Sequence, residues 1–176
     1  MGSNVITVFD LDREIRLTAF LNNAKPDLSP ANKRATAERL VEQQLIRREI
    51  ALGQYPVPEP SAVGPLPANL PRIAEYGLTE QEVKDALLWQ LTLLRFVEVR
   101  FRPGIQVSDQ KIRDYFEKVV EPAARAARPG TDITIEDYRE QIEATLTGQR
   151  SDRELNTWMN DARKRTDIIY HDEVFQ

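Results

Sequence analysis

Residues 107–142 read VSDQKIRDYFEKVVEPAARAARPGTDITIEDYREQI, and in this stretch one helix start follows closely on another. Ser108 and Thr134 are each a typical N-cap residue before an apolar run. Pro122 should kink or end the first of the two helices. Residues 121–130, between the two patterns, are interpreted as a short linker, because an independent domain needs at least about 50 residues.

The composition predicts a single soluble globular domain with no obvious charged ligand. The chain has 176 residues, of which 41% are apolar and 30% charged, and its net charge is -4. No basic patch is evident, so nucleic acid is not expected as a partner. The chain has no cysteine, and we expect no cofactor and no metal site. No apolar run approaches the roughly 20 residues that span a bilayer, so no membrane span is predicted.

The first half of the sequence predicts a strand followed by two helices. Residues 5–9 are rich in β-branched side chains and are interpreted as a strand. Asp10 is then expected to cap a first helix. Ser29 before Pro30 is a strong start for a second helix, which should end at Gly53.

The segment 55–71 differs in kind, because six of the eleven prolines of the chain lie in it. Proline lacks a backbone donor and blocks helix formation, so an extended strap is predicted here. A linker is the favoured interpretation, and a proline-rich ligand for a partner domain is the alternative.

A central helix is predicted from Glu80 to about Phe101, with Thr79 as its cap. Its apolar residues surround the helix axis, which leaves two interpretations open. The helix is either the core of a small bundle or one wall of an apolar groove that binds peptides. The residues proposed for such a groove are Trp89, Leu93, Phe96 and Phe101.

The C-terminal part predicts more helix and then a short strand. Residues 135–165 form either one helix or two with a break near Gly148. Residues 168–174 return to a strand-like composition, and we expect them to pair with residues 5–8. The predicted fold class is therefore mainly α, with a small β-sheet joining the two chain ends.

Several stretches resemble the peptide-binding framework of the SurA-like periplasmic chaperones and parvulin-type foldases. DLDREIRLTAFLNN and AERLVEQQLIRREI are similar to the first two helices of that family. LTEQEVKDALLWQLTLLRFVEVRF is similar to the helix that ends its N-terminal part, and VSDQKIRDYFEK to the segment that usually leads into an isomerase domain. IEATLTGQRSDRELNTWMNDARKRTDIIYHDEV is similar to its C-terminal helix and strand.

The resemblance implies one peptide-binding module over residues 1–176. Residues 5–120 would be its N-terminal helical part, residues 121–130 would replace the isomerase domain, and residues 131–176 would complete the module. His171 is the single histidine, whereas the parvulin site carries a histidine pair, so no catalytic residue is proposed.

The implied function is that of a periplasmic holdase for unfolded or outer-membrane-type polypeptides. We expect a mature chain from which a signal peptide has been removed, and a homodimer with exchanged C-terminal helices. Two other functions stay open at this point, a divergent peptidyl-prolyl isomerase and a helical adaptor for one specific partner.

Overall fold

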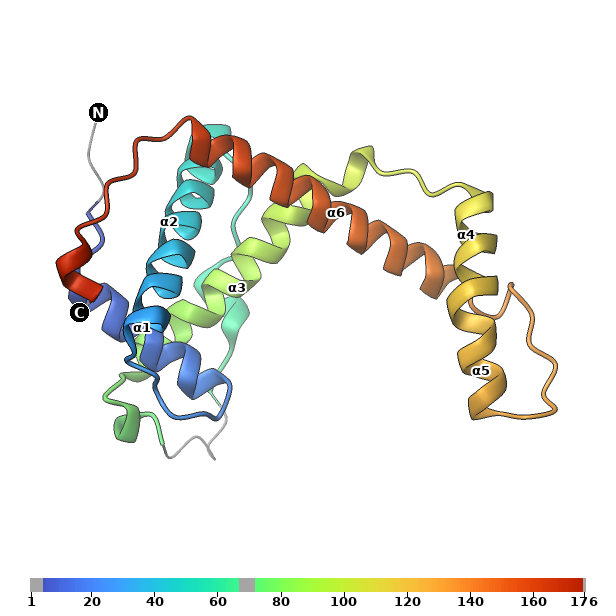
Figure 1. The fold of residues 1–176 in the computed structure, drawn as a ribbon, viewed down its shortest axis with the longest axis horizontal. Helices are drawn as coiled ribbons and strands as arrows, with labels where there is room; N and C mark the ends of the chain where they lie inside the picture. Colours follow the sequence, from blue (N-terminus) through green and yellow to red (C-terminus); the bar gives the residue numbers. More distant parts are fainter. Residues whose placement is uncertain (1–4, 67–71, 176) are drawn as a thin grey trace. The chain divides into compact units, whose positions relative to one another are not determined.

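The computed structural model describes residues 5–66 and 72–175, and within these ranges the chain is helical and contains no strand. The predicted mainly α class is confirmed, and the predicted β-sheet is wrong. The α-helices are α1 Val8–Leu21, α2 Pro30–Gly53, α3 Glu80–Arg100, α4 Asp109–Tyr115, α5 Glu121–Ala127 and α6 Arg139–Lys164 (Figure 1).

The chain divides into two compact units, and two helices contribute to both. Unit 1 comprises Met1–Phe96 with Met159–Gln176, and unit 2 comprises Val97–Trp158. The boundaries therefore lie inside α3 and inside α6. No α-helix within the described ranges is long and apolar enough to cross a membrane.

Residues 5–7 have no regular structure and α1 begins at Val8, where a strand was predicted over residues 5–9. Thr7 is the N-cap, and its hydroxyl accepts a hydrogen bond from the Asp10 amide at 3.2 Å. The Asp10 carboxylate in turn accepts one from the Thr7 amide at 2.9 Å. This reciprocal capping box satisfies two amides at the start of the helix. Asp10 is thus the third helical residue and not the cap.

The two chain ends meet through side chains and not through paired backbones. Residues 167–171 have no regular structure, and Asp172–Phe175 form a 3-10 turn. Phe175 is buried with Leu11 and Ala37, and Tyr170 packs against the same cluster. This apolar contact stands in place of the expected sheet, since residues 5–7 have no regular structure and Val8 already belongs to α1.

The helices α2 and α3 begin where the sequence predicts. The Ser29 hydroxyl accepts a hydrogen bond from the Asn32 amide at 3.3 Å, and α2 ends at Gly53 as predicted. Thr79 and Glu82 form a second capping box at the start of α3, with hydrogen bonds of 2.8 and 3.2 Å. Local cap chemistry therefore sets both helix starts.

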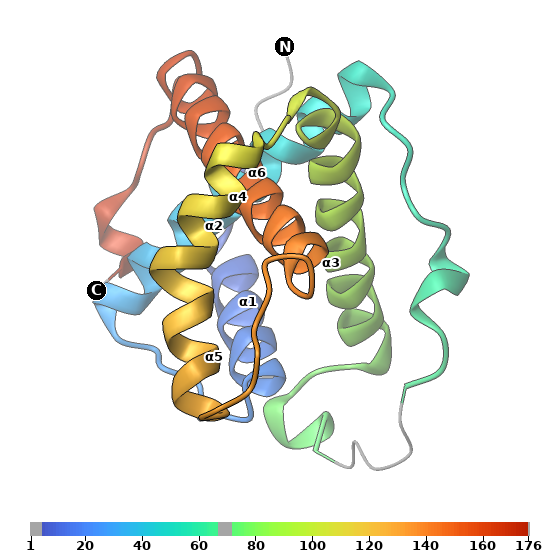
Figure 2. The same cartoon turned by 90° about the vertical axis from the view of Figure 1, so that its right-hand side faces the viewer.

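The described part of the proline-rich strap, residues 55–66, runs along α3 (Figure 2). Tyr55 packs edge-to-face on Phe96, with 5.3 Å between ring centroids. At the other end of the strap, Leu66 packs on a cluster that includes Val83. The strap thus covers part of the helix that is apolar nearly all round. The remainder of the predicted strap, residues 67–71, lies outside the described residues.

Unit 2 contains helix where a linker was predicted. A π-helical turn, Phe116–Val120, joins α4 to α5. Pro122 has no amide to donate to the carbonyl of Lys118, and its ring would collide with that carbonyl in a regular helix. The wider π turn avoids this collision, so the chain continues as helix through residues predicted as a linker.

The helix α6 starts later than predicted and is unbroken. Thr134 and Asp137 form hydrogen bonds of 3.2 and 2.7 Å, but the residues that follow form a turn and α6 begins at Arg139. The helix continues through Gly148, which settles the choice between one helix and two. Ile142 is 1% exposed and packs with Ile112 and Phe116 in the core of unit 2.

Candidate functional site

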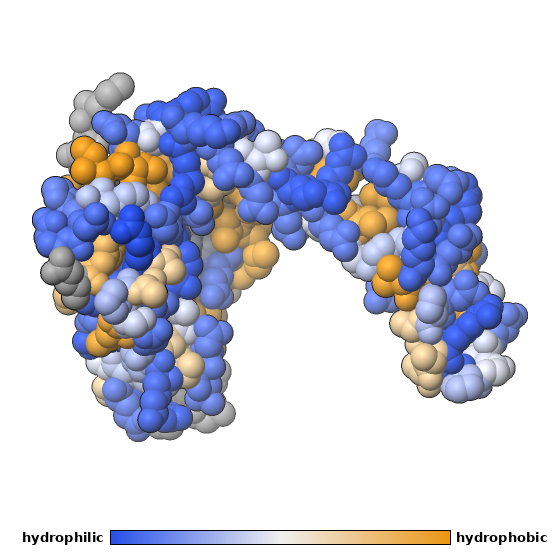
Figure 3. Space-filling view, viewed as in Figure 1, coloured by the Kyte–Doolittle hydropathy of each residue, from blue (hydrophilic) through white to orange (hydrophobic). Residues whose placement is uncertain are grey.

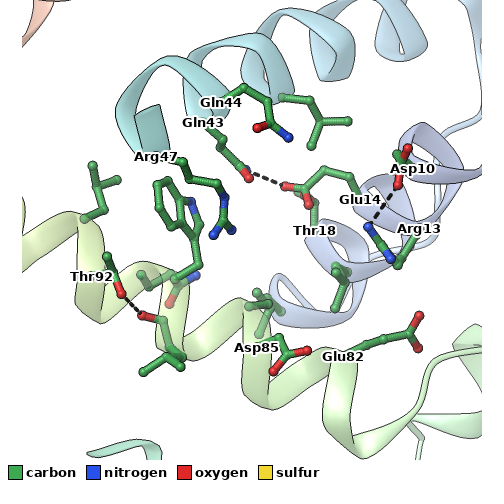
Figure 4. Close-up of a pocket in the computed structure, with 18 of the residues that line it drawn as sticks. Asp10, Arg13, Glu14, Thr18, Gln43, Gln44, Arg47, Glu82, Asp85 and Thr92 are labelled. Carbon is green, nitrogen blue, oxygen red and sulfur yellow. Dashed lines mark hydrogen bonds and ion pairs between the residues drawn. The ribbon is translucent and has the colours of Figure 1, made fainter. Parts of the chain in front are cut away.

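A cavity of about 790 Å³ lies in unit 1 between α1, α2 and α3 (Figure 4). Small-molecule and peptide side-chain sites commonly occupy roughly 300–1,000 Å³, so this volume is sufficient for a ligand. Apolar and polar groups share the lining. The apolar side chains include Val5, Ile6, Leu17, Leu21, Leu40, Ala86, Leu88, Trp89 and Leu93, and the charged ones are Asp10, Arg13, Glu14, Arg47, Glu82 and Asp85.

Helical spacing brings these side chains to the cavity. On α1 the lining residues Asp10, Glu14 and Thr18 recur every four residues, which places them on one face. The residues Leu11 and Ile15 of α1 are buried instead. On α2 the lining residues Leu40, Gln43, Gln44 and Arg47 follow the same helical repeat, and on α3 so do Glu82, Asp85, Ala86, Trp89 and Leu93.

Arg47 and Trp89 form a cation–π contact in the cavity lining. The guanidinium carbon of Arg47 lies 4.0 Å from the centroid of the indole of Trp89. Part of the Arg47 side chain is exposed to solvent. Partial burial of its guanidinium group lowers the pKa of Arg47, and the carboxylates of Glu14 and Asp85 oppose that shift. Arginine stays protonated in proteins, so a cation lies on the indole at neutral pH.

The acidic side chains of the cavity are already engaged in hydrogen bonds. Glu14 accepts a hydrogen bond from the Gln43 amide group at 3.2 Å, as Figure 4 shows. Asp85 accepts one from Gln81 at 2.8 Å. Hydrogen bonds from the Thr7 side chain and backbone hold the pKa of Asp10 below its usual value, and Arg13 lowers it further.

Glu82 behaves like Asp10, since hydrogen bonds from the backbone and side chain of Thr79 lower its pKa. Four carboxylates thus face two guanidinium groups in the lining, an excess of two negative charges. The cavity therefore presents an apolar wall with a rim that carries more acidic than basic side chains.

The structure separates the four residues proposed from the sequence. Trp89 and Leu93 line the cavity, and both are half-buried. Phe96 lies about two turns further along nearly the same side of α3, where Tyr55 covers it and its exposure is 1%. Phe101 belongs to unit 2 and packs against Trp158, with 6.4 Å between ring centroids.

Sequence reasoning missed the polar residues that α1 and α2 contribute, such as Glu14, Gln43 and Arg47. Their spacing on each helix is visible in the sequence, but their shared position depends on which faces of α1, α2 and α3 pack together. His171 is exposed and lies 3.6 Å from Glu173, outside the cavity lining. Within the described ranges, no group of three or more acidic or histidine side chains is placed to hold a metal ion.

Comparison with known proteins finds no matching family model, no matching curated protein and no matching solved structure. Functional conclusions therefore rest on the residues of the chain and their geometry.

Proposed function

We propose that the protein is a holdase that binds short extended segments of unfolded polypeptides in the cavity of unit 1. The observation that carries this proposal is the lining itself, in which the half-buried Trp89 and Leu93 are surrounded by hydrogen-bonding groups. An unfolded chain exposes apolar side chains together with unpaired backbone amides and carbonyls. A site with an apolar wall and a polar rim can bind both.

Exposed apolar surface beside the cavity supports the proposal. Val5 in the cavity lining is 76% exposed, and Val8 and Phe9 in the first turn of α1 are 53% and 70% exposed. Figure 3 shows apolar surface (orange) interrupting a mostly hydrophilic exterior on unit 1. Contiguous apolar patches that stay exposed in a folded protein are typical of surfaces that bind other chains. The resemblance to the SurA-like framework points in the same direction and adds a periplasmic location and outer-membrane-type clients to the proposal.

A specific adaptor is the second candidate function. The fixed contact between Arg47 and Trp89 and the excess of acidic groups favour it, because they would select a partner by charge as well as by apolar contact. A holdase should bind many unfolded chains with similar affinity, whereas an adaptor should bind one sequence far more tightly than its scrambled version.

Replacing Trp89 by alanine tests the proposal directly. We expect the Trp89→Ala variant to bind a labelled, denatured test protein about tenfold or more weakly, as is usual for a large aromatic residue at a binding site. Binding is measured by fluorescence anisotropy, alongside suppression of aggregation of the same client. Trp158→Ala is the matched control, because Trp158 contacts Phe101 in unit 2 and lies outside the cavity.

The two variants separate the possible outcomes. Unchanged client binding by Trp89→Ala, or an equal loss in both variants, would contradict the cavity as the binding site. A loss confined to Trp89→Ala that appears with one client and not with scrambled or unrelated clients would favour the adaptor.

A further inference from the structure

The segment 167–175, named here the tail, lies on an apolar surface that continues into the cavity. Tyr170, Val174 and Phe175 of the tail pack with Leu11 and Ala37. Ile6 and Leu40 belong to the same cluster and also line the cavity. We define the tail seat as the surface formed by Ile6, Leu11, Arg34, Ala37 and Leu40. The tail seat and the cavity are therefore neighbouring parts of one surface of unit 1.

Arg34 is the polar group of the tail seat. Its guanidinium carbon lies 5.7 Å from the ring centroid of Tyr170 and 5.5 Å from that of Phe175. It also pairs with the carboxylate of Asp172 at 2.8 Å. The side chains of Arg34 and Asp172 are 54% and 75% exposed, so this ion pair contributes little to docking. Apolar burial of Phe175 and Tyr170 is the main attraction.

The tail fits its seat imperfectly. In the part of the chain that the structure describes, the Tyr170 hydroxyl is buried and has no hydrogen-bond partner. A buried hydroxyl that loses its water without gaining a partner opposes docking. The tail also forms no strand with residues 5–66 or 72–166, so side chains provide the attachment. A segment that is attached only by side chains can be displaced by a similar segment with a better fit.

We propose that the tail seat is a second polypeptide-binding surface, and that the tail of the protein occupies it in competition with clients. This inference rests on the proposed function and extends it by naming the kind of segment that is bound. The tail defines that segment by its own chemistry. It is a short segment that ends in a single helical turn, with aromatic residues at the positions of Tyr170 and Phe175 and an acidic residue between them that meets Arg34. A client that displaces the tail would bind over the seat and the adjoining cavity.

A peptide of residues 166–175, which contains the whole tail, tests the proposal. Labelled TDIIYHDEVF is titrated into the full chain and its variants, and anisotropy reports binding. Phe175→Ala weakens the docking of the protein's own tail but leaves the seat unchanged. The added peptide should therefore bind at least about tenfold more tightly. Tyr170→Phe removes the unpaired hydroxyl and so strengthens the docking of the protein's own tail. Because this tail competes for the seat, the added peptide should bind about tenfold more weakly.

Two controls keep the test decisive. Tyr76→Phe is the matched tyrosine change, since the Tyr76 hydroxyl donates to the Ala24 carbonyl at 2.8 Å away from the tail seat, and it should leave peptide binding unchanged. Thermal unfolding confirms that each variant is folded. If Phe175→Ala unfolds the chain, Tyr170→Phe still decides the question, because it keeps the shape of the ring.

The proposal is overturned if the peptide binds equally to the parent chain, Phe175→Ala and Tyr170→Phe, or binds to none of them. Failure of the holdase proposal gives a different result. In that case the peptide affinities change as expected, but no variant binds the denatured client. Conversely, Trp89→Ala could lose client binding while the affinity for the peptide is the same in the parent chain, Phe175→Ala and Tyr170→Phe. That result would support the holdase proposal and exclude competition by the tail.

Discussion

Phe96 and Leu94 show how two neighbouring residues of α3 have opposite surroundings. Phe96 is 1% exposed and packs against Tyr55, whereas Leu94 is 66% exposed. Phe96→Ala should lower the free energy of unfolding by about 3–5 kcal/mol, since it removes a large ring from the core and leaves a cavity. Leu94→Ala is the matched control and should change it by less than about 0.5 kcal/mol. Urea denaturation measures both values.

A small loss for Phe96→Ala would contradict its role in the core and would return it to the list of binding residues. The sequence alone could not separate these residues. Apolar side chains occur nearly all round α3, and Phe96 lies on nearly the same side as Trp89. Burial of Phe96 depends on Tyr55 from the strap, and exposure of Trp89 to the cavity depends on how α1 and α2 pack. The candidate site was therefore predictable for Trp89 and Leu93 but not for its polar half.

At the scale of single elements, local cap chemistry decided which predictions succeeded. Ser29 before Pro30 and Gly53 gave the bounds of α2, because these residues act within one turn of the helix end. The N-terminal strand was predicted from β-branched residues, but Thr7 and Asp10 have the spacing of a capping box and favour helix. Residues 121–127 are alanine-rich, and proline is tolerated in the first turn, so their helix was also foreseeable.

The capping boxes of α1 and α3 should make stability depend on pH. Hydrogen bonds lower the pKa of Asp10 and of Glu82 in the folded state. The stabilisation of the folded state by each carboxylate is therefore fully present above its unfolded pKa. It should be lost as the pH falls below about 4 and the carboxyl groups take up protons. Asparagine keeps an acceptor oxygen but loses the negative charge near the helix N-terminus, so we expect Asp10→Asn to be less stable than the parent chain by about 0.3–1 kcal/mol at pH 6.

Urea denaturation of both chains at pH 6, pH 4 and pH 2.5 checks this prediction. The difference between the parent chain and Asp10→Asn should shrink towards the lowest pH, because the parent carboxyl is then also uncharged. A difference that stays constant across the range would show that the charge of Asp10 does not support the cap.

At the scale of the whole molecule, one helix supplies core residues to both units. Ile142 is 1% exposed in unit 2, and Met159 is 7% exposed in unit 1. Arg163 of α6 also pairs with Glu42 of α2 at 3.0 Å and with Glu38. Sequence reasoning anticipated a single long helix as one of two alternatives for residues 135–165. It could not anticipate the division into two units, which depends on contacts between distant segments.

A chain shortened to end at Pro129 should lose most of its stability. It would lack α6 and the tail, and with them Ile142, Met159 and Phe175, all of which are buried. We expect no cooperative thermal transition and an increase in the fluorescence of a dye that binds exposed apolar surface. Calorimetry and dye binding measure the two effects. Melting close to the parent temperature would show that the remaining helices fold without α6.

The shared position of α6 also has a consequence for the order in which the molecule can be built. A ribosome makes the chain from its N-terminus, so α1 to α5 emerge before α6 and the tail. Until then the packing partner Ile142 is missing from the cluster around Ile112, and Phe175 is missing from the cluster around Leu11. Both units therefore remain incomplete through most of synthesis, and during that interval the growing chain exposes the same kind of apolar segments that we propose the finished protein binds.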